Sequence, residues 1–288
     1  MNPKSGKKNK LDKIKSLIRQ IFNSTDHEYE FVTTTGPGDA TNLTKNGVHE
    51  SYDIISAVGG DGTVNEVAKG LVHTDSALGI IPLGSGNGLA RSLLIPLDIK
   101  KSIQYLTDAT ITSIDTGRIN EYYFFGVTGI GLDANIGKKF QEFGKRGPLP
   151  YFFIGLKEYL NYKPKKYVIK NKGNSFTVEP LLITIANTVQ YGNGAIIAPQ
   201  ADPRDGLLDV CIVNKIPLIK ALYYIPRLFY GSIHTIPYYS SFKTKSVQIS
   251  FTEKKGAIHT DGEPFITGNI LNIKILKKAL KVCSPLGN

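Results

Sequence analysis

The sequence predicts an α/β domain with a parallel sheet, followed by a β-rich domain with helical insertions. Strand-type and helix-type segments alternate over the first 110 or so residues, which is the rhythm of βαβ units. From about residue 115, short β-type runs separated by turn signals take over, as in a mainly antiparallel sheet. With 288 residues the chain is long enough for two ordinary domains. We place these at 1–113 and 114–288, and the last strand is able to return to the first domain.

Hydrophobic periodicity defines the elements of the first domain. Uninterrupted apolar runs indicate buried strands, and apolar residues three or four positions apart indicate helices. Parallel strands joined through helices bind ligands at their carboxyl ends. After a loop at 2–6, the predicted elements are a helix at about 10–22, a short strand near Tyr29–Thr34, a loop at 36–40, a strand at 53–58, a helix at 63–73, a strand at 77–82 and a helix that begins near Gly88.

The second domain contains several β-type runs and two helical stretches. The runs are Tyr122–Val127, Leu181–Ala186, Leu207–Val213, Ser246–Phe251 and Ile270–Leu276. The helical stretches, at about 131–162 and 217–230, are rich in aromatic residues and in Lys and Arg. Such helices suit a membrane interface, where cationic side chains meet anionic headgroups and aromatic rings lie at the boundary. Core packing with a solvated face is the equally weighted alternative.

The composition is that of a basic globular protein. Lys and Arg number 35 against 24 Asp and Glu, for a formal net charge of +11. This surplus favours anionic partners: nucleic acid, nucleotide, or the anionic face of a membrane. The two cysteines, Cys211 and Cys283, have no metal-binding spacing and indicate a reducing cytosol. No apolar run approaches the roughly 18 residues of a spanning helix, so we expect none.

A glycine turn at 59–62 joins the strand at 53–58 to the helix that follows it. Thr63 and Glu66 have the Thr-x-x-Glu spacing of a capping box, which marks the start of that helix. Free backbone N–H groups at a helix N-terminus suit an anion such as a phosphate. Asp61 places a carboxylate where a phosphate-bound Mg²⁺ or a substrate hydroxyl could be met. The turn therefore predicts a phosphate site with an acidic partner.

A second strand–glycine-turn–helix device follows at Leu83–Gly88, within about 25 residues of the first. One such turn is often only a connection, but two in tandem indicate a shared ligand. With the Ser-Gly of the loop at 2–6, they predict three walls of one polyphosphate site. The spacing is neither that of the Walker loop nor Gly-x-Gly-x-x-Gly.

Four motifs, taken together and in order, resemble the diacylglycerol kinase catalytic-domain family, which also contains sphingosine, ceramide and bacterial lipid kinases. The match covers nearly the whole chain. The resemblance implies an N-terminal domain similar to that of phosphofructokinases and NAD kinases, and a β-rich C-terminal domain. It also implies ATP in the cleft between the domains and phosphorylation of a lipid hydroxyl. The motifs are Asn2-Pro3-x-Ser5-Gly6, Gly59-Gly60-Asp61-Gly62-Thr63-Val64-Asn65-Glu66, Pro82-Leu83-Gly84-Ser85-Gly86-Asn87 and Asp261-Gly262-Glu263.

The resemblance assigns residues to the nucleotide and to a metal ion. Asp205 is implied as a side-chain ligand of a structural Mg²⁺, with Asp202 and Leu207 nearby through backbone carbonyls. Oxygen ligands in a tight turn suit a hard cation, although an ordinary Asp-Gly turn is the alternative. The implied nucleotide contacts are Asn2, Pro3, Lys4, Ser5, Gly6, Thr34, Gly59, Gly60, Asp61, Gly62, Thr63, Val64, Asn65 and Ser85.

Two acidic residues compete for the catalytic role. Asp261-Gly262 between two β-type runs alone would be read as a hairpin turn. The resemblance instead implies that Glu263 accepts the proton of the lipid hydroxyl, with Asp61 as the rival base or as the holder of catalytic Mg²⁺. Asp133 is implied near the acceptor lipid, or is a helix-entry residue. His259 is given no role.

The sequence departs from the family pattern at two places. Met1 directly precedes Asn2, so the apolar strand usual before this loop is missing from the sheet or the start codon is misplaced. Gly88 stands where many bacterial members have Asp, which is similar to the sphingosine-kinase-like branch.

We therefore expect an ATP- and Mg²⁺-dependent lipid kinase of phospholipid metabolism that acts on diacylglycerol or a sphingoid-type lipid. An NAD kinase-like enzyme and a catalytically silent lipid-binding or regulatory protein are the alternatives. We expect a cytoplasmic protein in peripheral contact with the anionic inner face of the membrane, and no nucleic-acid partner. A homodimer is left open.

Overall fold

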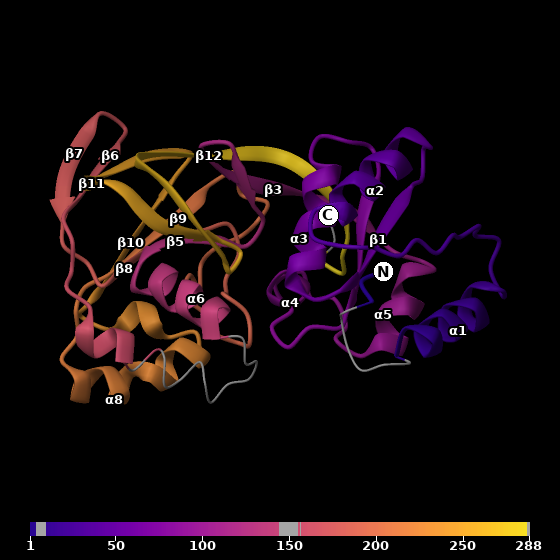
Figure 1. Cartoon of the computed structure of the whole chain (residues 1–288), viewed down its shortest axis with the longest axis horizontal. Coiled ribbons are helices and arrows are strands. Elements are labelled where there is room, and N and C mark those ends of the chain that lie inside the picture. Colours follow the sequence, from indigo (N-terminus) through magenta and orange to yellow (C-terminus); the bar gives the residue numbers. More distant parts are fainter. Residues whose placement is uncertain (4–9, 144–154, 156, 287–288) are drawn as a thin grey trace. The chain divides into compact units, whose positions relative to one another are not determined.

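The computed structural model describes residues 1–3, 10–143, 155 and 157–286 of the chain. It divides into two compact units (Figure 1). The first unit comprises Met1–Thr116 and Lys277–Asn288, and the second comprises Gly117–Leu276. Two strands, β3 (Ile111–Ile119) and β12 (Glu263–Cys283), contribute residues to both units.

The first unit is an α/β unit with a parallel sheet, as the sequence predicts. Strand β1 pairs in parallel with β2 along its whole length, from Ile54 opposite Ala77 to Gly59 opposite Pro82. The end of β12 pairs in parallel with the other edge of β2, with Lys281 opposite Ala77. All six residues of β2 are buried, as expected for a central strand covered on both faces. The elements are α1 (Lys10–Phe22), α2 (Asp39–His49), β1 (Ile54–Gly59), α3 (Asp61–Leu71), β2 (Ala77–Pro82), α4 (Gly88–Ser92) and α5 (Ile99–Leu106).

Two of these helices, α2 and α5, were not predicted, and one predicted strand is wrong. The segment 29–34 has no strand assignment, and Thr34 N–H donates to the carbonyl of Met1 at 3.0 Å. Helix α2 buries only Ala40 and Thr44, so its sequence has too few apolar residues for a clear helical stripe. It forms because it packs against α3, a contact between segments far apart in the sequence.

The predicted capping box at Thr63 and Glu66 is also wrong. Helix α3 begins two residues earlier, at Asp61, with Gly60 as its N-cap and no side-chain cap. The carboxylate of Glu66 instead accepts the N–H groups of Gly38 at 2.9 Å and Ala40 at 3.2 Å. Glu66 thus satisfies orphan donors at the start of α2, where the N-cap glycine has no side chain to do so.

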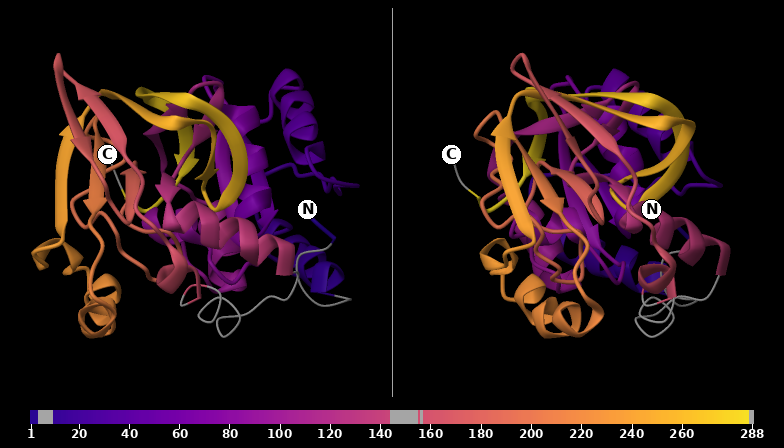
Figure 2. Two further views of the ribbon diagram at one scale, coloured as in Figure 1. Left: turned by 60° about the vertical axis from the view of Figure 1, so that its left-hand side comes forward. Right: turned by 90° about the vertical axis from the view of Figure 1, so that its left-hand side faces the viewer.

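The second unit is β-rich with helical insertions, as predicted. Its strands pair antiparallel, β10 to β9, β9 to β8, β8 to β5 and β5 to β11, while β11 pairs with both β12 and β6. Figure 2 shows the β6–β7 hairpin as a projecting arm. The elements are β4 (Tyr122–Phe124), β5 (Val127–Gly131), α6 (Leu132–Phe143), β6 (Tyr167–Asn171), β7 (Asn174–Val178), β8 (Leu182–Ala186), β9 (Leu208–Val213), α8 (Leu218–Phe229), η1 (Ile233–Thr235), β10 (Tyr239–Thr244) and β11 (Ser246–Thr260).

The two predicted helical stretches have different outcomes. Helix α8 matches the stretch at 217–230 within a residue at each end. Of the stretch at 131–162, α6 covers the start, whereas residues 144–154, with Lys145, Arg146 and the aromatic group at 151–153, lie outside the described residues. In the parts of the chain that the structure describes, no helix combines the length and apolarity needed to cross a bilayer.

Candidate nucleotide and acceptor sites

The two glycine turns lie directly against each other in the first unit. Because β1 and β2 are parallel neighbours, their carboxyl ends meet at one edge of the sheet. A Cβ added to Gly84 would lie 2.9 Å from the Cα of Gly60, and one added to Gly60 would lie 3.2 Å from the Cα of Gly84. Backbone therefore packs on backbone, an approach that only glycine permits.

Asp61 joins the two turns. Its carboxylate oxygens accept the backbone N–H groups of Asn87 at 2.9 Å and Gly88 at 2.7 Å. A Cβ on Gly86 would lie 2.7 Å from the same carboxylate. Both oxygens of the residue predicted to meet Mg²⁺ or a hydroxyl are thus used to hold the second turn in place. Asp61 therefore positions the second turn against the first.

Asn87 and Arg91 shape the second turn, and neither was among the predicted site residues. Asn87 adopts a left-handed conformation with φ of 49°. Its side-chain amide accepts the N–H of Gly84 at 3.0 Å and donates to the carbonyl of Gly84 at 2.8 Å. Arg91 Nε donates to the carbonyl of Gly86 at 3.0 Å. Asn87 could have been found because asparagine tolerates this conformation; Arg91 has no such signal.

The N-terminal loop lies beside the first turn. Asn2 donates its backbone N–H to the carbonyl of Val58 at 3.1 Å and its side-chain amide to Thr63 Oγ1 at 3.0 Å. Among the predicted nucleotide contacts, Thr34, Thr63, Val64 and Asn65 are buried, whereas Pro3, Gly62 and Ser85 are exposed. Lys4, Ser5 and Gly6 lie outside the described residues.

In the second unit, Asp261-Gly262 forms the hairpin turn between β11 and β12. Both residues have positive φ, 50° and 84°, as the tightest hairpin turns require. The Asp261 carboxylate accepts the N–H groups of Phe125 at 2.9 Å, Gly126 at 2.8 Å and Val127 at 3.0 Å. Burial raises the pKa of Asp261, and the three N–H donors oppose that rise.

This anchored turn fixes the position of Glu263. Glu263 is the first residue of β12, pairs with Thr260 across the hairpin and is exposed. Asp261-Gly262 is therefore a hairpin turn, and this is compatible with the role implied for Glu263, because Glu263 directly follows the turn.

A buried His–Asp pair lies next to the turn. His259, only 4% exposed, places Nε2 3.2 Å from Asp133 Oδ2, and Tyr191 donates its hydroxyl to the same oxygen at 3.3 Å. The N–H of Gly262 points at His259 Nδ1 at 3.4 Å, so we assign the ring proton to Nε2, facing Asp133. A Cβ on Gly129 would lie 2.2 Å from Asp133 Oδ2, so this glycine makes room for the pair.

These contacts occupy both carboxylate oxygens of Asp133. Asp133, implied near the acceptor lipid, has one carboxylate oxygen engaged by His259 and Tyr191, and the other by the N–H of Ala134 at 2.8 Å. His259 thereby connects Asp133 to the turn that carries Glu263. Sequence reasoning gave His259 no role because a single histidine in a strand is more often structural.

Lys243 engages the loop at 202–207, where the resemblance implies a structural Mg²⁺. Lys243 places its ammonium 2.6 Å from Asp205 Oδ2 and 3.5 Å from Asp209 Oδ2, and donates to the carbonyl of Gln200 at 2.9 Å. Asp205 Oδ1 accepts the N–H of Leu207. Within the described part of the chain, no group of three or more His, Cys, Asp or Glu side chains could hold a metal. In this structure the ammonium of Lys243 is the counter-charge of Asp205 and Asp209.

Partial burial lowers the pKa of Lys243, but the hydrogen bond that Lys243 donates to Asp205 and the charges of Asp209 and Asp205 outweigh this effect, so the net pKa shift is upward. Burial raises the pKa of Asp209, and Lys243 opposes that rise. Both effects of the pairing, the raised pKa of Lys243 and the opposition to the rise at Asp209, are those expected when the ammonium of Lys243 stabilises the negative charge of the buried Asp209 carboxylate.

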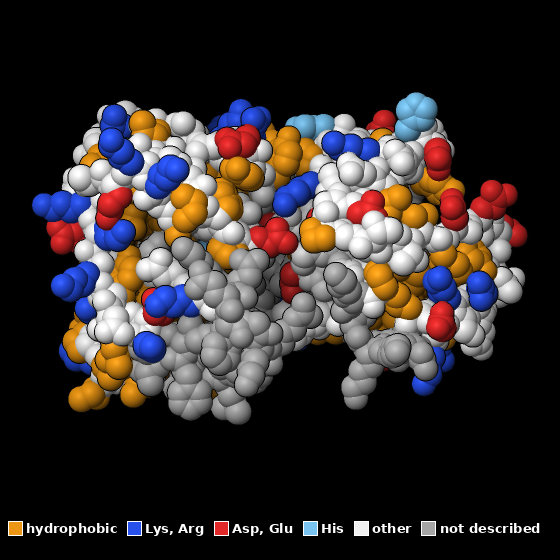
Figure 3. Space-filling view, viewed as in Figure 1, with side chains coloured by type: hydrophobic (Ala, Val, Ile, Leu, Met, Phe, Trp, Pro, Cys, Tyr) orange, Lys and Arg blue, Asp and Glu red, His pale blue; other side chains and the backbone are white. Residues whose placement is uncertain are grey.

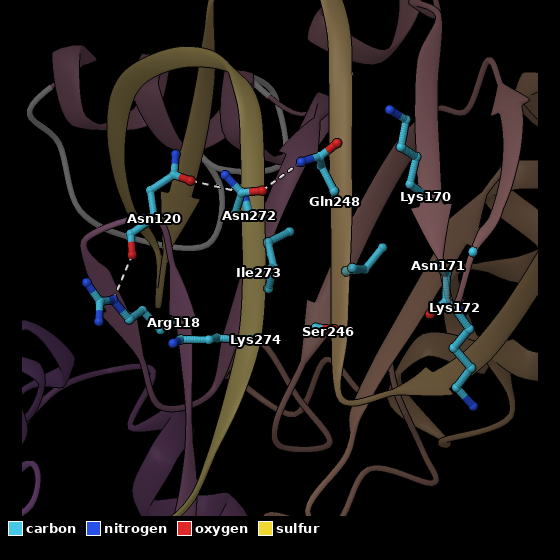
Figure 4. Close-up of a pocket in the computed structure, with 12 residues that line it drawn as sticks. Arg118, Asn120, Lys170, Asn171, Lys172, Ser246, Gln248, Asn272, Ile273 and Lys274 are labelled. Atoms are coloured by element: carbon cyan, nitrogen blue, oxygen red, sulfur yellow. Dashed lines mark hydrogen bonds between the residues drawn. The ribbon is translucent and has the colours of Figure 1, made fainter.

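A polar groove of about 570 Å³ opens on the sheet of the second unit, lined by β3, β12, β11 and β6 (Figure 4). None of the predicted site residues lines it. Asn120, Asn272 and Gln248 are hydrogen-bonded across its floor: Asn120 Oδ1 accepts the N–H of Asn272, and Gln248 Nε2 donates to Asn272 Oδ1. Its charged lining residues are all cationic: Arg118, Lys170, Lys172 and Lys274.

Comparison with known proteins gives two family matches that together cover nearly the whole chain. The family described as the diacylglycerol kinase catalytic domain matches residues 1–119. The family described as the YegS C-terminal NAD kinase beta sandwich-like domain matches residues 126–284. The boundary between them falls in the segment where β3 and β4 form a hairpin.

Relatives along the full chain are named diacylglycerol kinases. The Bacillus subtilis (strain 168) diacylglycerol kinase is 30% identical over 281 residues, covering 94% of this chain and 91% of that protein. The Staphylococcus haemolyticus (strain JCSC1435) diacylglycerol kinase is 30% identical over 291 residues, covering 99% and 86%. A solved diacylglycerol kinase structure from Bacillus anthracis str. Sterne has the same fold, with a TM-score of 0.78 at 22% identity over 99% of this chain and 95% of that chain.

Proposed function

The chain belongs to the diacylglycerol kinase family, and from this we propose that it transfers the γ-phosphoryl group of ATP to the hydroxyl of a membrane lipid. Family membership makes it a phosphotransferase with an alcohol group as acceptor. We take diacylglycerol or a sphingoid-type lipid as the acceptor. The observation that carries the proposal is the contact of Gly60 with Gly84, which brings two helix N-termini to one edge of the sheet.

The first unit supplies the grip on the triphosphate. Backbone N–H groups in the first turn of α3 suit phosphate oxygens, and Ser85 lies exposed in the facing turn. Asp61 keeps the two turns in register through its bonds to Asn87 and Gly88. Mg²⁺ enters this proposal as the counter-ion of ATP, where it would neutralise charge that develops on the phosphates. No step depends on an ion in the loop at 202–207.

We assign the role of base to Glu263. The family motif assigns the proton acceptor to Glu263, which is exposed at the start of β12, whereas the carboxylate of Asp61 holds the second glycine turn. Glu263 takes the proton of the lipid hydroxyl as the hydroxyl oxygen bonds to the γ-phosphorus, and the bond from that phosphorus to the ADP oxygen breaks. The proton then passes to water. Asp261 and His259 hold the turn from which the Glu263 backbone starts.

The test is transfer of label from γ-³²P ATP to a panel of diacylglycerol, sphingosine, ceramide and polyprenol, separated by chromatography. We expect label on one lipid, and a loss of about a hundredfold or more in kcat for Glu263→Gln. Glu179→Gln, at an exposed position of the same unit, serves as the control. An absence of transfer to every lipid would support the silent lipid-binding alternative, and label on NAD would support the NAD kinase-like one.

We further propose that the enzyme acts in the cytoplasm, in peripheral contact with the anionic inner face of the membrane. The formal net charge of +11 supports this, since basic residues near an anionic leaflet each contribute about 1 kcal/mol. Sedimentation with vesicles at low and high salt tests it: binding that persists unchanged at high salt would contradict an electrostatic contact.

A further inference from the structure

Helix α8 carries large apolar side chains into solvent. None of its twelve residues is buried. Ile219 is 83% exposed, Tyr223 69%, and Tyr230, its C-cap, 84%; Leu222, Ile225 and Phe229 are exposed as well. Hydrophobic side chains project at the lower left of Figure 3, where α8 lies in Figure 1. Contiguous exposed apolar surface of this kind marks an interaction site.

One face of α8 packs against the core of the second unit, and the opposite face is exposed to solvent. Ala221, Tyr224 and Leu228 pack against the cluster formed by β8, β9 and the loop at 196–201. Ile219, Leu222, Tyr223 and Phe229 follow the three-, four- and seven-residue spacing of a second stripe. The helix is therefore anchored to the second unit by the first face, and the second stripe needs another partner.

The charged residues in the chain segment that contains α8 are all basic. No Asp or Glu occurs between Asp209 and Glu253, a stretch that contains Lys215, Lys220 and Arg227. Lys220 lies over the ring of Tyr238 and Arg227 over that of Tyr224, so both cations are held beside the helix. Cations flanking an apolar stripe with tyrosines at its margin match the interface of an anionic bilayer.

We propose that α8 is a membrane anchor that lies in the plane of an anionic bilayer with Ile219, Leu222, Tyr223 and Phe229 inserted below the headgroups. The proposal rests on the lipid-kinase function above and names the surface that meets the lipid. At about 18 Å the helix is too short to span a bilayer, so it lies along the interface. A second copy of the chain is a poorer fit, because a two-fold contact would place this basic helix face against an identical basic face.

The absence of tryptophan from the chain permits a direct test in the full protein. Tyr223→Trp places a single tryptophan on α8, and Phe176→Trp places one on β7, where Phe176 is also exposed. With vesicles of equal parts phosphatidylcholine and phosphatidylglycerol, we expect a blue shift and quenching by brominated lipid at position 223 only. Equal responses at both positions, or none at 223, would overturn the proposal. A blue shift that grows with protein concentration in the absence of vesicles would overturn it in favour of self-association.

A second experiment separates anchoring from chemistry. We expect the pair Ile219→Ser and Tyr223→Ser to weaken vesicle binding about tenfold or more, while transfer to a short-chain, water-soluble diacylglycerol stays at the wild-type rate. The control pair is Phe176→Ser on β7 with Ile270→Ser on β12, where both side chains are exposed. Equal vesicle binding by both pairs would contradict the anchor. Failure of wild-type transfer to every lipid would instead contradict the proposed function and leave the tryptophan result standing.

Discussion

At the scale of single residues, carboxylates in this protein hold backbone in place. Asp61 and Asp261 each accept several backbone N–H groups, and Glu66 caps a helix distant in the sequence. Charge-assisted bonds of this kind are shorter and stronger than neutral ones. The family motifs that contain Asp61 and Asp261 thus specify turn geometry as well as chemistry.

The substitution Asp61→Asn tests the positioning role. An amide offers one acceptor oxygen and turns a donor toward the N–H of Asn87 or Gly88, so the second turn loses one of its two bonds. We expect a loss of about 1–3 kcal/mol in the free energy of unfolding and a fall of at least tenfold in kcat/KM for ATP. Urea unfolding and steady-state kinetics measure the two effects. A variant with full stability and a changed pH–rate profile would instead favour Asp61 as a base.

The substitution Gly129→Ala tests the His259–Asp133 pair. The new Cβ would lie 2.2 Å from Asp133 Oδ2 and 2.7 Å from His259 Nε2, so the pair must separate. We expect a loss of stability of about 1–3 kcal/mol, as for overpacking and a broken buried bond, and reduced kcat. Gly268→Ala, on β12 with no atom within 4 Å of its Cβ, is the matched control. Equal behaviour of the two variants would show that the pair does not matter.

At the scale of elements, cross-strand pairing decides which charges meet. Lys243 on β10 is directly opposite Asp209 on β9, and Asp205 lies four residues before Asp209. The sequence showed the acidic loop but not the lysine, which follows about forty residues later. Register between two strands cannot be read from either strand alone, and opposed charges interact only when register places them together.

Lys243→Met removes the ammonium while keeping most of the aliphatic stem. The nearly buried Asp209 then loses its counter-charge, and we expect about 1–2 kcal/mol of destabilisation, since the ammonium is partly solvated. Lys245→Met, exposed two residues later, is the control, and adding Asp209→Asn is expected to recover stability. Urea unfolding measures all three. A rise in Tm with Mg²⁺ in Lys243→Met alone would show that the loop binds a cation once the lysine is gone.

At the scale of the whole molecule, two continuous strands belong to both units. Strand β3 runs out of the first unit and β12 runs back into it. Where β12 re-enters, Lys278 adopts a left-handed φ of 50° and its N–H donates to the buried carboxylate of Asp115 at 2.7 Å. The sheet of the first unit is therefore completed by the last residues of the chain.

The two cysteines report on the two units separately. Burial raises the pKa of Cys211, in the second unit, to about 12 and that of Cys283, in the first, to about 11. At pH 8 a thiol with pKa near 12 is thiolate in only about one molecule in ten thousand, so we expect no reaction with a disulfide reagent before unfolding. Because β3 and β12 belong to both units, Cys211→Ser and Cys283→Ser variants should become reactive at the same urea concentration.

Labelling of the two variants at clearly different urea concentrations would contradict this coupling.

The two thiols also give the free energy of unfolding a pH dependence of definite sign. Both folded-state pKa values are raised above the ordinary value of about 8.5, so the unfolded chain loses these protons first. Stability therefore falls as pH rises above about 8.5.

Local signals predicted the strand–turn–helix units, the Asp-Gly hairpin and the family motifs, because each depends on neighbours within a few residues. They also predicted the fold class, which follows from the change from alternating strands and helices to successive strands. Local signals wrongly predicted a strand at 29–34 and did not predict helix α2. In both segments a few contacts with distant parts of the chain determine the conformation.

The sequence by itself determined the periodicity, the turns and the identity of the chemical groups in this protein. The tertiary structure decided which groups meet: Glu66 caps α2 and not its own helix, Asp61 holds the second turn, and Lys243 neutralises the loop at 202–207. It also decided that one apolar stripe of α8 stays in solvent. The reason is physical, since hydrogen bonds and ion pairs between distant segments exist only after sheet register and helix packing bring the partners within about 3 Å.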